Sequence, residues 1–203
     1  MAETSQALKD LKLKSEIMEL VVSRFEQLPE TDKKIFEYGP IYLGINGAFA
    51  GLIANSFFRR VLKVTQARIT SSLPMAILPF LGTTALFQAT VSEPLVSGGL
   101  NCEVCAQVRG ALVTLVVGGL YPVALALPIN AGLASRYKTA PMPEKGKVVQ
   151  FLVKTSKPVF RKMVFVYLLQ AISGYYLATL QHRIYWKLLE LPDTNSEDRK
   201  TVD

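Results

Sequence analysis

Two cysteines provide the most suggestive chemistry in the sequence, because Cys102 and Cys105 form a C-x-x-C motif. One such motif supplies only two of the four ligands of a structural zinc site, and the sequence has no second pair. A redox-active pair requires a thiolate of low pKa, usually at a helix N-terminus, and the neighbouring Glu103 opposes the negative charge of a thiolate. We therefore expect either a local disulfide or two unreactive thiols, and both interpretations remain open.

Other residues that could do chemistry are scarce. The single histidine, His182, follows an uncharged segment, and we expect it at the edge of that segment rather than in a metal site. The glycine-rich run GINGAFAG lacks the lysine and the serine or threonine with which a phosphate-binding loop holds phosphate and magnesium. We accordingly predict no catalytic residues, no metal and no cofactor, and we expect that the protein is not an enzyme.

The composition indicates what kind of elements position these residues. The chain has 203 residues, of which 50% are hydrophobic and only 19% are charged, and its mean hydropathy is +0.26. Soluble domains carry about 25% charged residues. Intrinsic disorder is excluded by the abundance of apolar residues, and a disulfide scaffold is excluded because two cysteines cannot hold a chain of this length. The composition is typical of a membrane protein.

Charged residues divide the sequence into uncharged segments at 38–58, 69–92, 110–135 and 163–181. A helix of about 20 residues crosses a hydrocarbon core of about 30 Å, and only a helix satisfies all of its own backbone polar groups within lipid. We therefore predict an all-α, polytopic membrane protein with about four transmembrane helices. Pro74 and Pro79 make a broken or re-entrant second segment an alternative, because proline kinks a helix.

We expect three parts along the chain. Residues 1–37 form a polar N-terminal segment with an amphipathic helix, because apolar residues recur at helical spacing between 15 and 28. Residues 38–182 form the transmembrane domain, and residues 183–203 form a polar C-terminal tail. Proline-broken segments can also hold a small solute, so a transporter is an alternative, although the segments lack the ionisable residues that mark ion pathways.

Two connections between the uncharged segments are strongly basic. Residues 59–68 contain no acidic residue, and residues 136–162 contain only Glu144. Short basic connections stay on the side of insertion, so we predict that both face the cytoplasm or the matrix, with the chain termini opposite. Such a face suits anionic lipid headgroups, and it also suits RNA, such as that of a membrane-bound ribosome. Its residues are Arg59, Arg60, Lys63, Arg68, Arg136, Lys138, Lys145, Lys147, Lys154, Lys157, Arg161 and Lys162.

Small residues form a stripe along the first uncharged segment. The pairs Gly47/Gly51 and Gly44/Ala48 are each four residues apart, a spacing that lets a second helix approach closely. Asn55 can hydrogen-bond across such a contact. We expect the stripe to pack within the bundle of the chain itself, with an interface for a partner helix as the alternative.

Five stretches of the sequence resemble the vertebrate transmembrane protein 126 family: GLIANSFFRR, VTQARI, SLPMAILPFL, GGLYPVALALPINAGLASRY and TSKPVFRKM. The likeness runs from Phe25 to Lys187, which is most of the chain. Cys102 and Cys105 fit one of the two members of the family better than the other.

The resemblance implies a multi-pass protein of the mitochondrial inner membrane that assists assembly of the membrane arm of respiratory complex I. It implies complex I membrane-arm subunits and assembly factors as partners, together with the insertase that receives mitochondrially made proteins. The family brings no catalytic residues and no small-molecule substrate. We therefore expect a non-enzymatic assembly factor or chaperone. The alternative within the same setting is a companion of the inner-membrane insertase and the mitoribosome during co-translational insertion.

Overall fold

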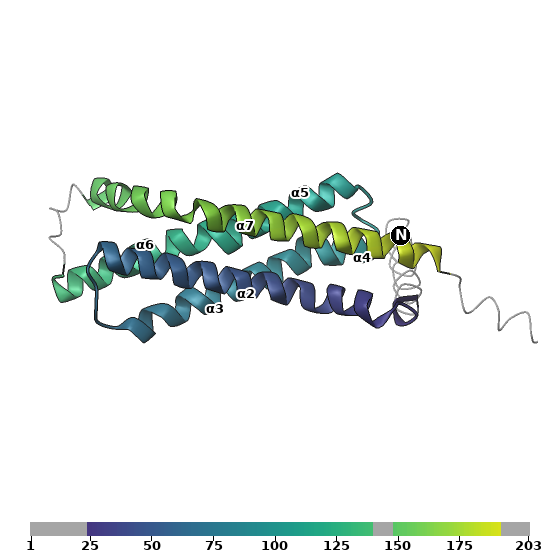
Figure 1. Ribbon diagram of the computed structural model, residues 1–203, viewed down its shortest axis with the longest axis horizontal. Coiled ribbons are helices and arrows are strands. Elements are labelled where there is room, and N and C mark those ends of the chain that lie inside the picture. Colours follow the sequence, from purple (N-terminus) through teal and green to yellow (C-terminus); the bar gives the residue numbers. More distant parts are fainter. Residues whose placement is uncertain (1–23, 140–147, 192–203) are drawn as a thin grey trace, which may run out of the picture.

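Four long helices lie side by side in the computed structural model, which describes residues 24–139 and 148–191 (Figure 1). The first is α2 (Glu30–Val61), and the second runs through α3 (Arg68–Phe87), the π-helical segment η1 (Gln88–Ser92) and α4 (Glu93–Val96). The third runs through α5 (Glu103–Val113), η2 (Thr114–Leu120) and α6 (Tyr121–Tyr137), and the fourth is α7 (Val148–Glu190). All four are long and apolar enough to span a membrane, and the described residues contain no strand, which confirms the predicted fold class.

The helices extend beyond the uncharged segments at most of their ends. Acidic Glu30 and Asp32 occupy the first turn of α2 and basic Arg59 and Arg60 its last turn, which are the charges that a helix dipole favours at those positions. The polar turns outside the uncharged segments therefore continue the same helices. The expected amphipathic helix over 15–28 lies mostly outside the described residues, although Phe25 packs edge-on against Phe36 with ring centroids 5.9 Å apart.

Proline does not break the second helix into a re-entrant segment. Pro74 and Pro79 lie inside α3, whereas Pro94 and Pro122 each occupy the second position of the helix that follows a π-helical segment. A proline ring clashes with the carbonyl of residue i−4 in a regular helix, and the wider turn before each of these two prolines moves that carbonyl away. The alternative of a broken second span is thus not what the structure shows.

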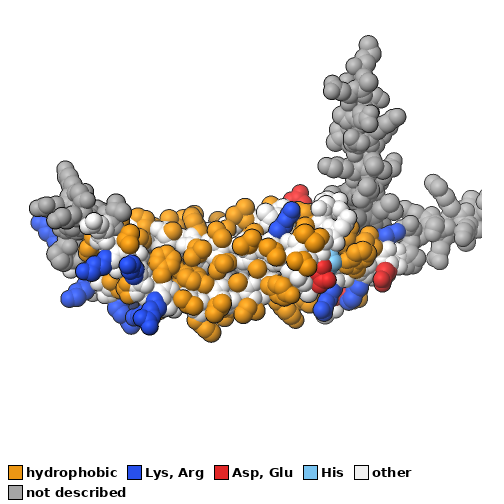
Figure 2. All heavy atoms as spheres, turned by 90° about the horizontal axis from the view of Figure 1, so that it is seen from above, with side chains coloured by type: hydrophobic (Ala, Val, Ile, Leu, Met, Phe, Trp, Pro, Cys, Tyr) orange, Lys and Arg blue, Asp and Glu red, His pale blue; other side chains and the backbone are white. Residues whose placement is uncertain are grey.

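The start of α2 and the end of α7 lie at the same end of the bundle. Lys187 Nζ is 3.0 Å from Asp32 Oδ2, and Arg24 Nη1 donates a hydrogen bond of 3.4 Å to Leu189 O. The connection between α4 and α5 lies at this end too, while the α2–α3 turn and the end of α6 lie at the other (Figure 1). Figure 2 shows a broad hydrophobic band between the two ends, which carry the charged side chains.

The interior and the exterior of the bundle have the pattern expected of a protein surrounded by lipid. Phe165 and Ile172 on α7 are 74% and 65% exposed, whereas the polar side chains of Thr83, Asn130 and Gln170 are fully buried. In water such an arrangement is unfavourable, because exposed apolar surface is hydrated and buried polar groups lose hydrogen bonds to solvent. In a bilayer the apolar surface meets acyl chains instead of water, and the polar side chains are kept away from those chains. Asn130 donates a hydrogen bond to Asn55, whereas Thr83 Oγ1 and the Gln170 amide have no hydrogen-bond partner among the described residues.

Candidate functional site

The small-residue stripe of α2 is covered by α3. A Cβ atom on Gly51 would overlap the carbonyl oxygen of Met75, and one on Gly44 would overlap Oγ1 of Thr84. A Cβ atom on Gly47 would lie 2.9 Å from Oγ1 of Thr83. These glycines therefore let the α2 and α3 backbones approach each other within the chain, and the stripe is not exposed to a partner helix. Ala48, which belongs to the same predicted set, is only half-buried.

Asn55 joins three helices beyond the C-terminal end of this stripe. Its Nδ2 donates to Ser71 Oγ at 3.3 Å and to Ser72 Oγ at 3.1 Å, and its Oδ1 accepts from Asn130 Nδ2 at 2.8 Å. The bonds connect α2 to α3 and to α6, and each of them lies in or beside the buried interior. Asn46, which also lies on α2, has a buried Nδ2 with no hydrogen-bond partner among the described residues.

A second close contact lies between α5 and α7, where Ala106/Gly110 and Gly174/Ala178 are each four residues apart. A Cβ atom on Gly110 would lie 2.6 Å from the carbonyl oxygen of Gly174, and one on Gly174 would overlap Oγ1 of Thr114. Thr114 Oγ1 lies 2.8 Å from Gln170 O on α7 and 2.9 Å from Gly110 O, so its single proton is shared between two helices. This spacing marks small residues on each helix, but it does not show that the two sets pack against each other.

The predicted basic residues gather at one end of the bundle. Arg59, Arg60, Lys63 and Arg68 lie at the α2–α3 turn, Arg136 and Lys138 end α6, and Lys154, Lys157, Arg161 and Lys162 lie on the first half of α7. In Figure 2 the Lys and Arg side chains at this end have no acidic side chain among them. Lys145 and Lys147 lie outside the described residues. The opposite end carries both signs of charge, including the Lys187–Asp32 pair.

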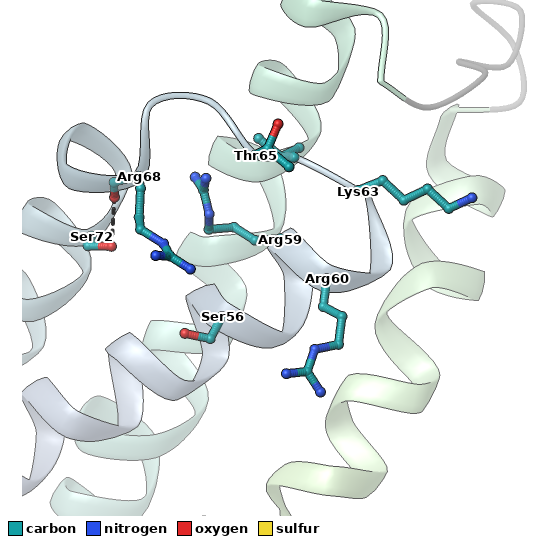
Figure 3. A pocket seen from close by; sticks show the side chains of 8 residues that line it. Ser56, Arg59, Arg60, Lys63, Thr65, Arg68 and Ser72 are labelled. Carbon is teal, nitrogen blue, oxygen red and sulfur yellow. Dashed lines mark hydrogen bonds between the residues drawn. The ribbon is translucent and has the colours of Figure 1, made fainter.

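Four of these cations line a cavity of about 740 Å³ at the α2–α3 turn. Figure 3 shows Arg59 and Arg68 close to each other, whereas Arg60 and Lys63 extend away from them. The cavity is lined by Ser56, Arg59, Arg60, Lys63, Val64, Thr65, Arg68 and Ser72. Arg59 is 8% exposed, and it donates hydrogen bonds to Ser71 Oγ at 2.9 Å and to Gln66 O at 2.8 Å. These bonds hold the turn against α2, and they fix the guanidinium at the wall of the cavity. The charges were predictable from the sequence, whereas the cavity was not.

Cys102 and Cys105 are exposed free thiols at the start of α5. Cys102 is the residue before the helix, and its Sγ accepts a hydrogen bond of 3.2 Å from the backbone N–H of Cys105. The Cys105 thiol and then this N–H hydrogen-bond to the sulfur and lower the pKa of Cys102, because they stabilise its thiolate. The motif thus occupies a helix N-terminus, a position that the sequence alone did not establish. The expected disulfide remains a prediction.

The only histidine is buried. His182 is 4% exposed, its ring lies edge-on to that of Trp186 with centroids 6.2 Å apart, and its Nε2 has no hydrogen-bond partner in the described part of the chain. The sequence placed it at the edge of a span, whereas the structure places it inside the bundle near one end. Within the described residues no three histidine, cysteine or acidic side chains come together as metal ligands.

The outer surface has an apolar groove of about 510 Å³ between α2 and α7. Tyr38 and Tyr42 line it from α2, and Ile172 and Tyr176 line it from α7. All three tyrosine side chains are more than half exposed. Each combines an apolar ring with a hydroxyl that can donate or accept a hydrogen bond. The groove therefore lies on the lipid-facing side and offers polar groups there.

These features define the class of the protein: a membrane-embedded four-helix bundle with closed helix contacts and one basic end. The profile of the family described as Transmembrane protein 126 matches residues 15–195. The chain belongs to the transmembrane protein 126 family, which confirms the resemblance found in the sequence.

Named relatives give the degree of similarity. The mouse protein "Transmembrane protein 126A" is 51% identical over 181 residues, which cover 89% of this chain and 92% of the relative. The human protein of the same name is 49% identical over 174 residues, covering 86% and 89%. Mouse "Complex I assembly factor TMEM126B, mitochondrial" is 30% identical over 169 residues, covering 83% and 73%. No solved structure matches the chain significantly.

Proposed function

We propose that the protein is a non-enzymatic assembly factor for the membrane arm of respiratory complex I in the mitochondrial inner membrane. The observation that carries this proposal is the 30% identity, over 83% of this chain, to a mouse relative named as a mitochondrial complex I assembly factor. The four membrane-capable helices agree with a role inside a membrane. The outer surface, which is apolar and free of charge in its middle part, suits transient contact with other transmembrane helices (Figure 2).

The structure narrows where such contact can occur. The glycine stripe of α2 is covered by α3, and Gly110 of α5 and Gly174 of α7 cover each other, so neither surface is open to a partner helix. A newly inserted subunit must therefore meet the outer face of the bundle. We infer that the groove between α2 and α7 is part of this contact, because Tyr42 and Tyr176 offer hydrogen bonds that a transmembrane helix can use in lipid.

Removal of the protein tests the general role. Cells that lack it should contain less fully assembled complex I on native gels, while complexes built only from nuclear-encoded subunits stay at their normal level. The full chain expressed from a plasmid should restore complex I. Normal complex I in the deleted cells would contradict the proposal.

Photo-crosslinking tests the contact surface. A photoreactive amino acid at Tyr42, which is 59% exposed, should crosslink to newly made complex I membrane subunits. The same amino acid at neighbouring Leu43, which is fully buried, should crosslink only within the chain and serves as the matched control. Equal crosslinking to other chains from both positions, or none from Tyr42, would remove the outer face as the contact.

A second candidate is a companion of the inner-membrane insertase and the mitoribosome. The concentration of cations at one end of the bundle favours it, because ribosomal RNA attracts such a surface, and the positive-inside rule places that end toward the matrix. Pulse-labelling of mitochondrial translation products separates the two candidates. A defect in inserting several mitochondrially encoded proteins supports the companion role, whereas a defect confined to complex I supports the assembly factor.

A further inference from the structure

The cavity at the α2–α3 turn concentrates positive charge without compensation. None of its cations, Arg59, Arg60, Lys63 and Arg68, forms an ion pair with any carboxylate among the described residues. The sequence contains no acidic residue between Glu37 and Glu93, so none is available nearby along either helix. Arg59 and Arg68 also repel each other across the cavity. An anion between them would relieve this repulsion.

Arg59 is held in a position to contribute to such a site. A guanidinium carries five N–H donors. Nη1 donates to Ala67 O and Ser71 Oγ, and Nη2 donates once to Gln66 O, which leaves Nε and one proton of Nη2 without a partner in the described residues. The side chain is more than nine-tenths buried, so these bonds and the surrounding turn fix its direction. Planar, fixed guanidinium groups bind phosphate oxygens well.

The backbone near the cavity offers few free acceptors that would repel an anion. At the end of α2, Phe58 O accepts from Leu62 N, Arg59 O from Val64 N, and Arg60 O from Lys63 N. Leu62 O accepts from Thr139 Oγ1. On the other wall, Arg68 O accepts from Ser71 and Ser72. These carbonyl groups therefore already accept hydrogen bonds, and the four cations of the lining make the potential of the cavity positive.

The position of the cavity selects the source of the anion. Arg59 and Arg60 directly follow the uncharged segment 38–58, so they lie where the hydrocarbon core gives way to headgroups. Beside the cavity, α3 presents Ile69 and Leu73, which are 81% and 59% exposed and lie one helical turn apart. A free phosphate ion and the phosphate backbone of RNA are polar, so neither gains from contact with these exposed apolar side chains. A phospholipid meets the cations with its headgroup and these side chains with its acyl chains.

We propose that the cavity at the α2–α3 turn is a binding site for the phosphate groups of an anionic phospholipid in the leaflet at the basic end of the bundle. Four cations exceed the charge of one phosphodiester, so the site fits a doubly charged, diphosphatidyl headgroup better than a singly charged one. Arg59 forms the fixed wall, and Arg60, Lys63 and Arg68 provide the exposed cations. This lipid site does not depend on the proposed role as an assembly factor.

The test uses the full chain purified in an uncharged detergent. Native mass spectrometry measures the binding of cardiolipin, phosphatidylglycerol and phosphatidylcholine to the unaltered protein and to an R60Q/K63Q/R68Q variant. Cardiolipin should bind most tightly and phosphatidylcholine least, and the variant should bind cardiolipin about 100-fold more weakly. Buried Arg59 is left in place so that the turn keeps its hydrogen bonds.

The matched control is a K154Q/K157Q/R161Q variant, which removes the same charge from exposed positions on α7 at the same end. It should keep nearly full cardiolipin binding. Equal losses in both variants would overturn the site in favour of diffuse attraction, and an unchanged R60Q/K63Q/R68Q variant would overturn it altogether. If that variant does not fold, as judged by its melting curve, R68Q alone replaces it, with about a fivefold loss expected.

Two further arms separate the sources of phosphate. Inorganic phosphate and glycerophosphate at the same free concentration should not displace the lipid, because they lack acyl chains. Displacement by either would overturn the lipid in favour of a soluble phosphate ligand. A short RNA that binds the unaltered protein more tightly than cardiolipin, and that the R60Q/K63Q/R68Q variant loses, would overturn it in favour of nucleic acid.

Discussion

Two pairs of helices in the bundle, α2 with α3 and α5 with α7, approach each other closely at glycines, but the glycines are arranged differently. Between α2 and α3, three glycines on one helix face a continuous surface of the other, and Gly51 meets the Met75 carbonyl. Between α5 and α7, each helix contributes one glycine, and Gly110 and Gly174 approach each other directly. Lipid provides no hydrophobic force between apolar helices, so both contacts depend on close van der Waals packing and on a few hydrogen bonds.

The difference shows how tolerance of change is distributed. The α2–α3 contact has several small residues in succession, and Asn55 supports it with hydrogen bonds to Ser71 and Ser72 of α3. The α5–α7 contact depends on one crossing point, where Thr114 contributes the hydrogen bond to Gln170. A change in the first contact must displace a long length of helix, whereas a change in the second acts at one point.

The largest effect is expected for Gly51→Leu. The new side chain cannot fit against the backbone of Met75, so α2 must move away from α3 along its length. We expect a loss of about 3 kcal/mol or more, because overpacking a close contact costs about 1–3 kcal/mol even when only a methylene group is added. The measurement is the melting temperature of the purified protein in detergent. Gly132→Leu is the control, since a Cβ at Gly132 meets nothing within 4 Å, and equal melting of the two variants would contradict the close α2–α3 contact.

A smaller loss is expected for Gly174→Ala. Its Cβ would overlap Thr114 Oγ1 and the Gly110 carbonyl, so the crossing point must open by a local shift that costs about 1–3 kcal/mol. Gly132→Ala should have the opposite sign, because alanine favours a helix by about 0.5–1 kcal/mol over glycine where space is available. Both are measured by thermal unfolding. Stabilisation by both substitutions would show that α5 and α7 are farther apart than described.

A still smaller loss is expected for Thr114→Val, which keeps the shape of the side chain and removes its hydroxyl. The lost hydrogen bond to Gln170 O should lower stability by about 0.6 kcal/mol, the average for such bonds between transmembrane helices. Thr179→Val on α7 is the control, because Thr179 Oγ1 bonds only within its own helix at an exposed position. Identical changes in the melting temperature would mean that the Thr114 hydroxyl does not link the helices.

The start of α5 can be probed without unfolding the protein. The pKa of Cys102 is lowered first by the Cys105 thiol and then by the Cys105 N–H, so its thiolate should form at lower pH than that of an ordinary cysteine. After reduction, alkylation of Cys102 should therefore begin at lower pH than that of a cysteine in an unfolded peptide, as followed by mass spectrometry. C105A should move the profile to higher pH. A profile unchanged by C105A would contradict the thiol interaction, and absence of labelling before reduction would establish the predicted disulfide.

The sequence predicted the elements that depend on composition and spacing along one segment. The uncharged segments predicted four membrane-capable helices, and the spacing of Gly44, Gly47 and Gly51 predicted a close helix contact. Contacts between helices that are far apart in the sequence could not be predicted from the composition or spacing of one segment. The Gly110–Gly174 crossing pairs small residues of two different helices, and spacing within one segment does not show which helices pair. The hydrogen bond from Asn130 to Asn55 likewise joins two separate helices, α6 and α2. The cavity at the α2–α3 turn required the side-chain positions of Arg59 and Arg68.

The π-helical segment Gln88–Ser92 changes the direction in which the second transmembrane helix presents its side chains. An α-helix turns by about 100° per residue, and a widened turn accommodates an additional residue, so the far end of the helix is rotated by roughly that angle. Before the wide turn, Met75 and Pro79 of α3 pack against Gly51 of α2. Beyond it, Leu95 of α4 belongs to a cluster with Leu177 and Ala178 of α7, which Leu43 of α2 and Phe87 of α3 also join. Deleting a single residue from 88–92 would turn Leu95 away from that cluster, so the number of residues in this stretch matters more than which residues they are.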